Sequence, residues 1–294
     1  MLARAYAACE AMARAHYENF PVASRLLPRA MRPHVAAVYA YARVADDIAD
    51  EGSAPAAERQ AQLAAWQRRL HAAVAVERAA DAPHEHEDLI VIALAHSIRW
   101  LDLPIALFDD LLSAFAQDTM TTRYASWSEV LDYCRRSANP VGRLVLRVAG
   151  YDRADLDAAS DAVCTALQLT NFWQDLEIDW KKGRIYLPAA TRDDARAREE
   201  DLAARRMTAE WRRALGEAVA RTRRLFRAGV PVADGVRGRL RWELRATWLG
   251  GTRILDKLEA ADYDVFTRRP ALTRADVPPI LWHTLFWTAT DKHG

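Results

Sequence analysis

Two segments of the sequence carry aspartates at a spacing that brings their carboxylates together. "YARVADDIAD" contains Asp46 and Asp50, and "NFWQDLEID" contains Asp175 and Asp179. Residues four apart lie on one face of an α-helix, so each segment is expected to project two carboxylates in one direction. Apolar residues surround both pairs, which predicts that the two helices belong to the core.

Four carboxylates that line one cavity repel one another, and an uncompensated buried charge costs several kcal/mol. They therefore require cations. Carboxylate oxygens suit hard ions, and Mg²⁺ binds one or two carboxylates together with substrate phosphates and water. The predicted chemistry is a magnesium-bridged phosphate site. The alternative is that each pair faces solvent beside a lysine or arginine, but two pairs in apolar helices favour the metal.

Basic and aromatic residues beside the acids fit the departure of a diphosphate. Arg43 lies one helical turn before the first pair, and Lys182 and Arg184 follow the second pair. Such groups neutralise the charge that develops on a leaving diphosphate. A carbocation remains, and an aromatic face stabilises a cation by about 0.5–2 kcal/mol. Phe172 is a candidate for that role, with ordinary core packing as the alternative.

Helices must position these side chains. Apolar residues recur at helical spacing along nearly all of the 294 residues, and no alternating strand pattern exceeds a few residues. Pro104 is predicted to open one helix, and polar or proline-containing stretches at 81–88 and 262–279 are predicted loops. The arginine-rich segment 191–248 is predicted to form a solvated helical face with ion pairs four residues apart. We therefore predict a single all-α domain over residues 1–294.

Composition limits the partners and the compartment. The formal net charge is +1, whereas a general nucleic-acid binder carries a strong basic excess, so no nucleic-acid partner is expected. No apolar run reaches the ~18 residues that span a bilayer. Three scattered cysteines predict reduced thiols and a cytoplasmic location. Near the end, Trp282, Leu285, Phe286 and Trp287 fall on one side of a short helix that either packs into the core or contacts a membrane surface.

Together, the two acid segments with their flanks resemble those of the squalene/phytoene synthase family. The resemblance extends over nearly the whole chain and includes "NFPVASRLLP", "DLLSAFAQDT", "DYCRRSANPVG" and "RILDKLEAADYDVFTRR". It implies a single all-α domain of the isoprenoid synthase type, with helices packed around a central cavity. The family's chemistry, which the resemblance brings with it, joins two prenyl diphosphates into a cyclopropyl intermediate and then ionises that intermediate with Mg²⁺ as cofactor.

Matching positions imply roles for particular residues. The implied Mg²⁺ ligands are Asp46, Asp50, Asn171, Asp175 and Asp179. The implied substrate-binding residues are Phe20, Arg43, Gln168, Asn171, Phe172, Lys182 and Arg184. Tyr133 matches a tyrosine that faces the reacting centre, and with the four aspartates it completes the implied catalytic set. Arg268 and Arg269 are further candidates for contact with the diphosphate.

The sequence departs from many condensing members of the family at several positions. Those members carry an arginine at Gln174, a glutamate at Ile178 and a tyrosine at Gly251, and "VAGTVG" where this chain has "SANPVG". The altered set resembles the bacterial hydroxysqualene synthases. That branch converts presqualene diphosphate and water to hydroxysqualene and diphosphate without nicotinamide, and the resemblance implies functional coupling to the sister enzyme that supplies presqualene diphosphate.

Two other functions stay open at this stage. A condensing enzyme would make presqualene diphosphate, squalene or phytoene from two prenyl diphosphates, but the missing arginine and Gly251 count against it. A non-catalytic assembly module would be expected to have lost the metal acids, and all four are present. Because the implied substrate is a C30 lipid, peripheral contact with the inner face of the membrane is also expected.

Overall fold

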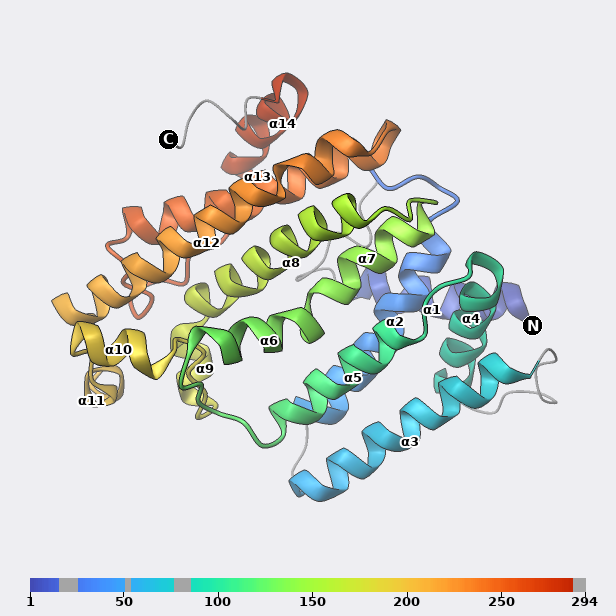
Figure 1. Ribbon diagram of the computed structural model, residues 1–294, viewed down its shortest axis with the longest axis horizontal. Coiled ribbons are helices and arrows are strands. Elements are labelled where there is room, and N and C mark those ends of the chain that lie inside the picture. The colour runs from blue at the N-terminus through green and yellow to red at the C-terminus, as the bar shows by residue number, and fades with distance from the viewer. Residues whose placement is uncertain (16–25, 51–53, 77–85, 288–294) are drawn as a thin grey trace. The chain divides into compact units, whose positions relative to one another are not determined.

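The computed structural model describes residues 1–15, 26–50, 54–76 and 86–287, so Phe20 lies outside the described residues. Within these ranges the chain forms helices and one isolated β-bridge, and it has no named strand (Figure 1). In chain order the helices are α1 (Leu2–Ala15), α2 (Arg32–Asp50), α3 (Ala56–Ala75), α4 (His86–Leu101), α5 (Ala106–Asp118), α6 (Trp127–Ser137), α7 (Asn139–Val148), α8 (Ala154–Gln174), α9 (Leu176–Lys181), α10 (Ala189–Ala195), α11 (Glu199–Ala203), α12 (Ala209–Gly235), α13 (Gly238–Ala260), the 3₁₀ helix η2 (Arg274–Asp276) and α14 (Val277–Phe286). The prediction of an all-α fold is confirmed.

The chain divides into two compact units whose segments alternate along the sequence. Unit 1 consists of Met1–Met120, Pro140–Asp157 and Gly238–Glu243, and unit 2 consists of Thr121–Asn139, Ala158–Arg237 and Leu244–Gly294. Helices α8 and α13 each contribute residues to both units. The single domain expected from the sequence stays a prediction, and each unit is described by itself.

Helix α2 is central to unit 1, because it packs against α1, α3, α4 and α5. Tyr41 is 1% exposed on α2, and its ring stacks on Trp66 with 5.1 Å between centroids and meets Phe108 edge-on at 5.9 Å. The Trp66 indole also donates a hydrogen bond to the Tyr41 carbonyl oxygen. These contacts fix the rotation of α2 about its axis, and so they fix the direction in which its acid pair projects.

In unit 2, helices α8, α12 and α13 are joined by close side-chain contacts. Trp173 is 1% exposed at the end of α8, and its indole donates a 2.9 Å hydrogen bond to Thr222 Oγ1 of α12. On α13, a Cβ at Gly251 would lie 2.5 Å from Phe226 Cζ and 2.7 Å from Leu167 Cδ2. A larger residue at Gly251 therefore requires both neighbours to move.

Two predicted loops are shorter than the sequence patterns indicated. Helix α4 already begins at His86, so the prediction of a loop was wrong for 86–88; Glu87 and Asp88 stabilise the positive end of that helix. Residues 81–85 lie outside the described ranges. Residues 277–279 belong to α14, since the two prolines occupy its first turn, where a missing N–H costs nothing.

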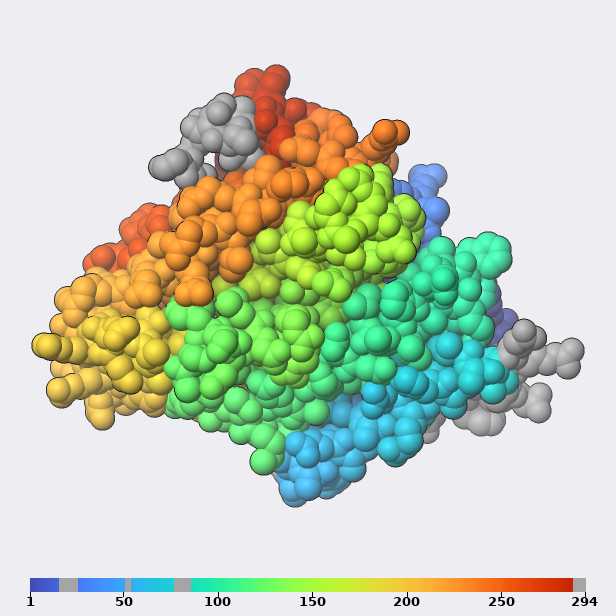
Figure 2. Space-filling view, viewed as in Figure 1, coloured from blue at the N-terminus to red at the C-terminus, as the bar shows by residue number. Residues whose placement is uncertain are grey.

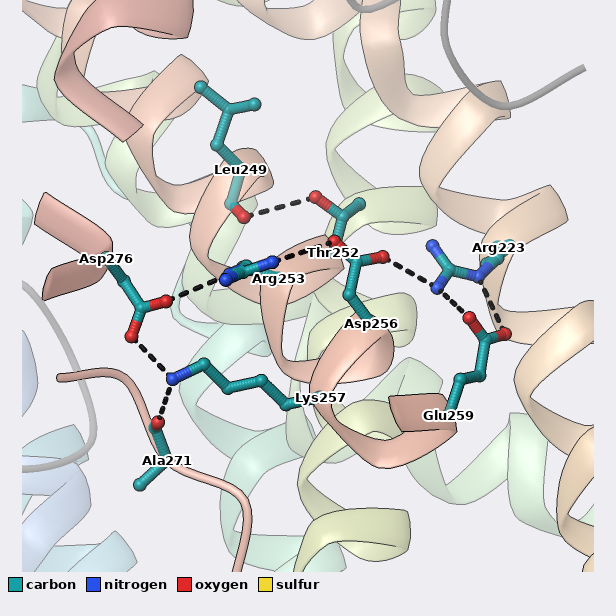
Figure 3. A network of polar contacts seen from close by, with 9 residues as sticks. All are labelled: Arg223, Leu249, Thr252, Arg253, Asp256, Lys257, Glu259, Ala271 and Asp276. Atoms are coloured by element: carbon teal, nitrogen blue, oxygen red, sulfur yellow. Dashed lines mark hydrogen bonds and ion pairs between the residues drawn. The ribbon is translucent and has the colours of Figure 1, made fainter. Parts of the chain in front are cut away.

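The arginines of the segment 191–248 make ion pairs that differ from those predicted. Arg223 of α12 binds Asp256 and Glu259 of α13 at 2.8 and 2.7 Å (Figure 3), and Arg212 binds Asp262 beyond the end of α13 at 2.6 Å. For these residues the predicted spacing of four within one helix was wrong. Packing of neighbouring helices brings residues more than thirty positions apart within reach of a guanidinium group.

Candidate active site

The first acid pair lies at the end of α2, on the side that also carries Arg43. Asp46 and Asp50 are one helical turn apart and both half-buried. Arg43 Nη1 lies 3.4 Å from Asp46 Oδ2, and Nη2 contacts Asp47 Oδ1. Burial alone would lower the pKa of the Arg43 guanidinium, but Asp47 and Asp46 raise it above its ordinary value. The predicted substrate cation is therefore held beside the acids by charge pairing in this structure.

The second acid pair spans the junction of α8 and α9. Asp175 lies between the two helices, yet the helical hydrogen bonds continue, because its N–H donates to the Asn171 carbonyl and its own carbonyl accepts from Asp179 N–H at 2.8 Å. The Asn171 amide donates a 2.7 Å hydrogen bond to Asp175 Oδ2. Gln168 precedes Asn171 by one turn on α8 and is half-buried. Asn171, Asp175 and Asp179 thus follow one face through the junction, as the spacing predicted.

A loop distant in sequence also contacts the second acid pair. Arg269 makes a two-point ion pair with Asp175, with 3.1 Å between its Nη2 and Oδ2, and the Asp175 side chain is 16% exposed. Next to it, the Gln174 amide donates to the carbonyl oxygen of Pro270. Arg269 was a candidate for diphosphate contact, and the structure places its guanidinium on a predicted metal ligand. Gln174 serves to hold the same loop.

The basic loop after the second acid pair has a fixed backbone. Lys182 directly follows the last residue of α9, and Gly183 adopts a left-handed conformation (φ 77°) that turns the chain toward Arg184. The Arg184 N–H returns to the Asp179 carbonyl at 2.8 Å, which ties the turn to the acid segment. Lys182 is exposed and Arg184 half-buried. The backbone of Arg184 is thus held beside Asp179, and the role of Lys182 and Arg184 in binding substrate stays a prediction.

Arg123 fixes the other side of this loop, and no motif in the sequence pointed to this residue. Its Nη1 donates to the Gly183 carbonyl at 2.5 Å, while Nε and Nη2 form a fork on the Glu199 carboxylate at 3.0 and 2.9 Å. The guanidinium also lies 5.7 Å from the centroid of Trp180. Hydrogen bonding to Arg123, with a further contribution from Arg192, lowers the pKa of Glu199. Arg123 therefore joins α11, the loop and the end of α9.

Four aromatic rings gather beside the second acid segment. Phe172 stacks on Tyr186 with 3.7 Å between centroids and 2° between planes, and Tyr133 lies 6.0 Å from Phe172 and 5.9 Å from Tyr186. Tyr124 stacks on Tyr186 at 5.7 Å, and all four are at most 7% exposed. We call Tyr124, Tyr133, Phe172 and Tyr186 the aromatic cluster. The predicted pair Tyr133 and Phe172 is brought together, whereas Tyr124 and Tyr186 were not singled out from the sequence.

The donor types fit the metal that the sequence predicted. Each acid pair offers carboxylate oxygens, and Asn171 adds an amide, which are ligands suited to Mg²⁺. Within the described ranges, no group of three or more His, Cys, Asp or Glu side chains is arranged to hold a metal ion. Glu177, beside the second pair, is bound instead by Lys181 and Arg205, which hold its pKa below the usual range.

The helical architecture and these residues together define a protein of the isoprenoid synthase type. The structure superposes on squalene synthase HpnC from Alicyclobacillus acidocaldarius with a TM-score of 0.81 and 37% identity, over 90% of this chain and 96% of that one. A dehydrosqualene synthase solved with a ligand shares the fold at a TM-score of 0.84, with 20% identity. None of the described helices is long and apolar enough to traverse a bilayer.

Sequence similarity identifies the family. Residues 13–276 match the squalene/phytoene synthase family, and this chain belongs to it. It is 36% identical to hydroxysqualene synthase of Zymomonas mobilis over 71% of this chain and 68% of that protein, and 32% identical to hydroxysqualene synthase of Rhodopseudomonas palustris over 90% and 84%. Phytoene synthase 3 of Zea mays is 30% identical over 91% of this chain, which spans 62% of that protein's length.

Proposed function

We propose that this protein is a Mg²⁺-dependent hydroxysqualene synthase, which converts presqualene diphosphate and water to hydroxysqualene and diphosphate. Relatives that carry this name are 32–36% identical to the chain, and the squalene synthase from A. acidocaldarius is 37% identical. The second candidate is condensation of two prenyl diphosphates, which the similarity to phytoene synthases favours.

In the proposed reaction, the C–O bond to the diphosphate breaks and the diphosphate leaves with the electron pair. Mg²⁺, held by Asp46, Asp50, Asp175, Asp179 and Asn171, would supply positive charge to the phosphate oxygens. Lys182 and Arg184, with Arg43 of the first acid segment, neutralise the remaining charge of the leaving group.

The aromatic cluster suits the cation that remains. The cyclopropylcarbinyl cation rearranges with opening of its ring, water adds to the rearranged cation, and loss of a proton leaves the alcohol. Tyr133 and the face of Phe172 that Tyr186 does not cover would attract the cation without forming a bond to it. Burial of the four rings keeps bulk water from that side, so that the cation survives long enough to rearrange.

The observation that carries the proposal is the set of contacts that Gln174 and Gly251 make. Where condensing relatives are expected to have an arginine, Gln174 donates to the Pro270 carbonyl. Where they are expected to have a tyrosine, Gly251 packs so closely on Phe226 and Leu167 that any side chain there requires both neighbours to move. Gln174 is thus used in a hydrogen bond and Gly251 in close packing, and neither supplies a group that could bind a second diphosphate. This supports a site for one diphosphate rather than two.

A product assay tests the proposal. Purified protein with Mg²⁺, and without nicotinamide, is given farnesyl diphosphate or presqualene diphosphate in separate reactions. We expect hydroxysqualene from presqualene diphosphate alone. Consumption of farnesyl diphosphate with formation of presqualene diphosphate, or of another C30 condensation product, would refute it. Asp175→Asn is expected to abolish turnover, whereas Asp193→Asn, an exposed acid on α10, is the matched control and is expected to retain it.

The setting of the reaction follows from the substrate. A C30 lipid diphosphate partitions into membranes, so we propose that the enzyme works in the cytoplasm at the inner face of the membrane. A presqualene diphosphate synthase would supply its substrate there, in functional coupling. Pull-down of that synthase, or substrate channelling in a coupled assay with an added trapping enzyme, tests the coupling.

A further inference from the structure

An apolar surface occupies the segment that ends the described chain. Leu272, Val277, Leu281, Trp282, Leu285 and Phe286 are each 47–61% exposed, and they account for six of the eleven exposed large hydrophobic side chains in the described ranges. We call these six residues the apolar cap. Leu281 and Leu285 follow Val277 at intervals of four, which places the three on one stripe of α14. Exposed apolar groups gathered in this way mark an interaction surface rather than a random surface.

The residues at both ends of α14 are fastened to α13. At the start of α14, Asp276 accepts hydrogen bonds from Arg253 at 2.9 Å and Lys257 at 2.5 Å (Figure 3). At its end, the Trp287 ring lies 5.6 Å from that of Trp248. Figure 1 shows α14 in red beside the orange α13. With both ends fixed, α14 cannot rotate to bury the apolar cap.

The inward side of α14 is the smaller and more polar one. Thr284 is 3% exposed, and Ile280 and His283 are half-buried. The red atoms of this segment are visible at the surface in Figure 2. The helix thus buries its polar threonine against the protein and turns its largest apolar side chains outward, which is the reverse of the pattern for a helix that serves only the core.

The charges around the cap select its partner. In the segment 265–287 the exposed ionic side chains are Arg268, Arg274 and Arg269, of which Arg269 is paired with Asp175, while the one acid, Asp276, is buried beneath its cations. Trp287 adds an aromatic ring under Arg245, at 4.9 Å. Apolar and tryptophan side chains with flanking arginines are typical of helices that lie in the interface of an anionic bilayer. A stable protein interface, in contrast, uses about 20–30 residues on each side, more than the cap supplies.

We propose that the apolar cap is a docking surface for the anionic face of a lipid bilayer. Leu281, Trp282 and Leu285 enter the interface between headgroups and acyl chains, and Arg274 approaches the headgroup phosphates. The contact holds the enzyme on the membrane in which a lipid diphosphate is dissolved. The link between docking and access to substrate rests on the proposed function, whereas docking itself is independent of the reaction.

Co-sedimentation with vesicles tests the proposal on the full-length protein. We expect binding to mixed phosphatidylcholine–phosphatidylglycerol vesicles, weaker binding to phosphatidylcholine alone, and weakening by salt. The triple variant Leu281→Ser, Trp282→Ser, Leu285→Ser is expected to lose at least tenfold in partition. The matched control is Val76→Ser with Met120→Ser, two exposed apolar residues elsewhere, which is expected to bind as the wild type does.

Several results would overturn the proposal. These are no binding of the wild type to anionic vesicles, unchanged binding of the triple variant, or a concentration-dependent dimer in ultracentrifugation that the triple variant abolishes. Thermal unfolding of all variants excludes misfolding. Turnover of presqualene diphosphate in detergent micelles separates the two proposals: we expect the triple variant to equal the wild type, whereas failure of the wild type there contradicts the proposed function and leaves the vesicle result intact.

Discussion

Substitution of Asp276 by asparagine is expected to release η2 and α14 from α13. Asp276 is 3% exposed and accepts four hydrogen bonds, from Lys257, Arg253 and the backbone and hydroxyl of Thr273. Hydrogen bonds to charged groups contribute about 1.5–3 kcal/mol each when sheltered, and the Lys257 side chain is 23% exposed. Because Arg253 is 46% exposed, its ion pair with Asp276 contributes less than about 1 kcal/mol to the attachment of η2 and α14. The expected total loss is about 3 kcal/mol.

Such a loss should appear locally, since it lowers the free energy of opening of one segment. At 1.4 kcal/mol for each factor of ten, about 3 kcal/mol corresponds to a roughly 100-fold faster hydrogen exchange of peptides covering η2 and α14. Exchange measured by mass spectrometry checks this, with peptides of α1 as the internal reference. Asp262→Asn is the control, because Asp262 pairs with Arg212 while 71% exposed and such pairs contribute little.

Two results would contradict a local anchoring role for Asp276. Exchange of α14 that rises less than about threefold would mean that the buried carboxylate does not anchor the helix. An equal rise across α1 and α12 would mean that Asp276 acts on the stability of the whole chain rather than on the attachment of α14.

Three further predictions concern the site loop, the core and the acid sensitivity. Arg123→Gln removes the fork to Glu199 and the bond to Gly183, so we expect kcat to fall at least tenfold with little change in unfolding temperature, and a wild-type kcat would contradict this. Gly251→Ala should destabilise the protein by about 1–3 kcal/mol through overpacking, as measured by urea unfolding against Gly250→Ala, whose Cβ would meet only Leu272 Cδ1 at 3.4 Å, and an unchanged midpoint would show that the neighbours yield freely. Burial, and then the nearby His96, lower the pKa of His34. The stability that neutral His34 contributes is present above its unfolded pKa of about 6.5 and is lost as pH falls through the folded value. The unfolding temperature of His34→Asn should therefore decline less at acid pH than that of the wild type.

The sequence was sufficient for those parts of the site that depend on local spacing. Asp46 and Asp50, like Asp175 and Asp179, share a helical turn because four residues make one turn. The cations after Asp179 likewise follow from adjacency in the chain. The all-α fold was also predictable, because apolar residues recur at a single period along nearly all the chain.

Contacts between distant segments could not be predicted in the same way. Arg269 reaches Asp175 across 94 positions, and Arg123 reaches Glu199 across 76, so no local pattern links the partners. Tyr186 joined the aromatic cluster for the same reason. The errors at 86–88 and 277–279 have a local cause. Acidic residues and prolines are common in loops, but they also favour the first turn of a helix, so the residue types alone do not distinguish the two.

Helix α13 takes part in several of these long-range contacts. Its glycine at 251 admits Phe226 and Leu167 to the core, and two turns later Lys257 binds both Asp276 and the carbonyl of Ala271 (Figure 3). The loop between α13 and η2 carries Arg269, which binds Asp175. One short segment therefore runs from a predicted metal ligand to the apolar cap without leaving the surface of unit 2. The proposed reaction, on a lipid with a charged head, would use both ends of this segment, and in this chain contacts with α13 hold it in place.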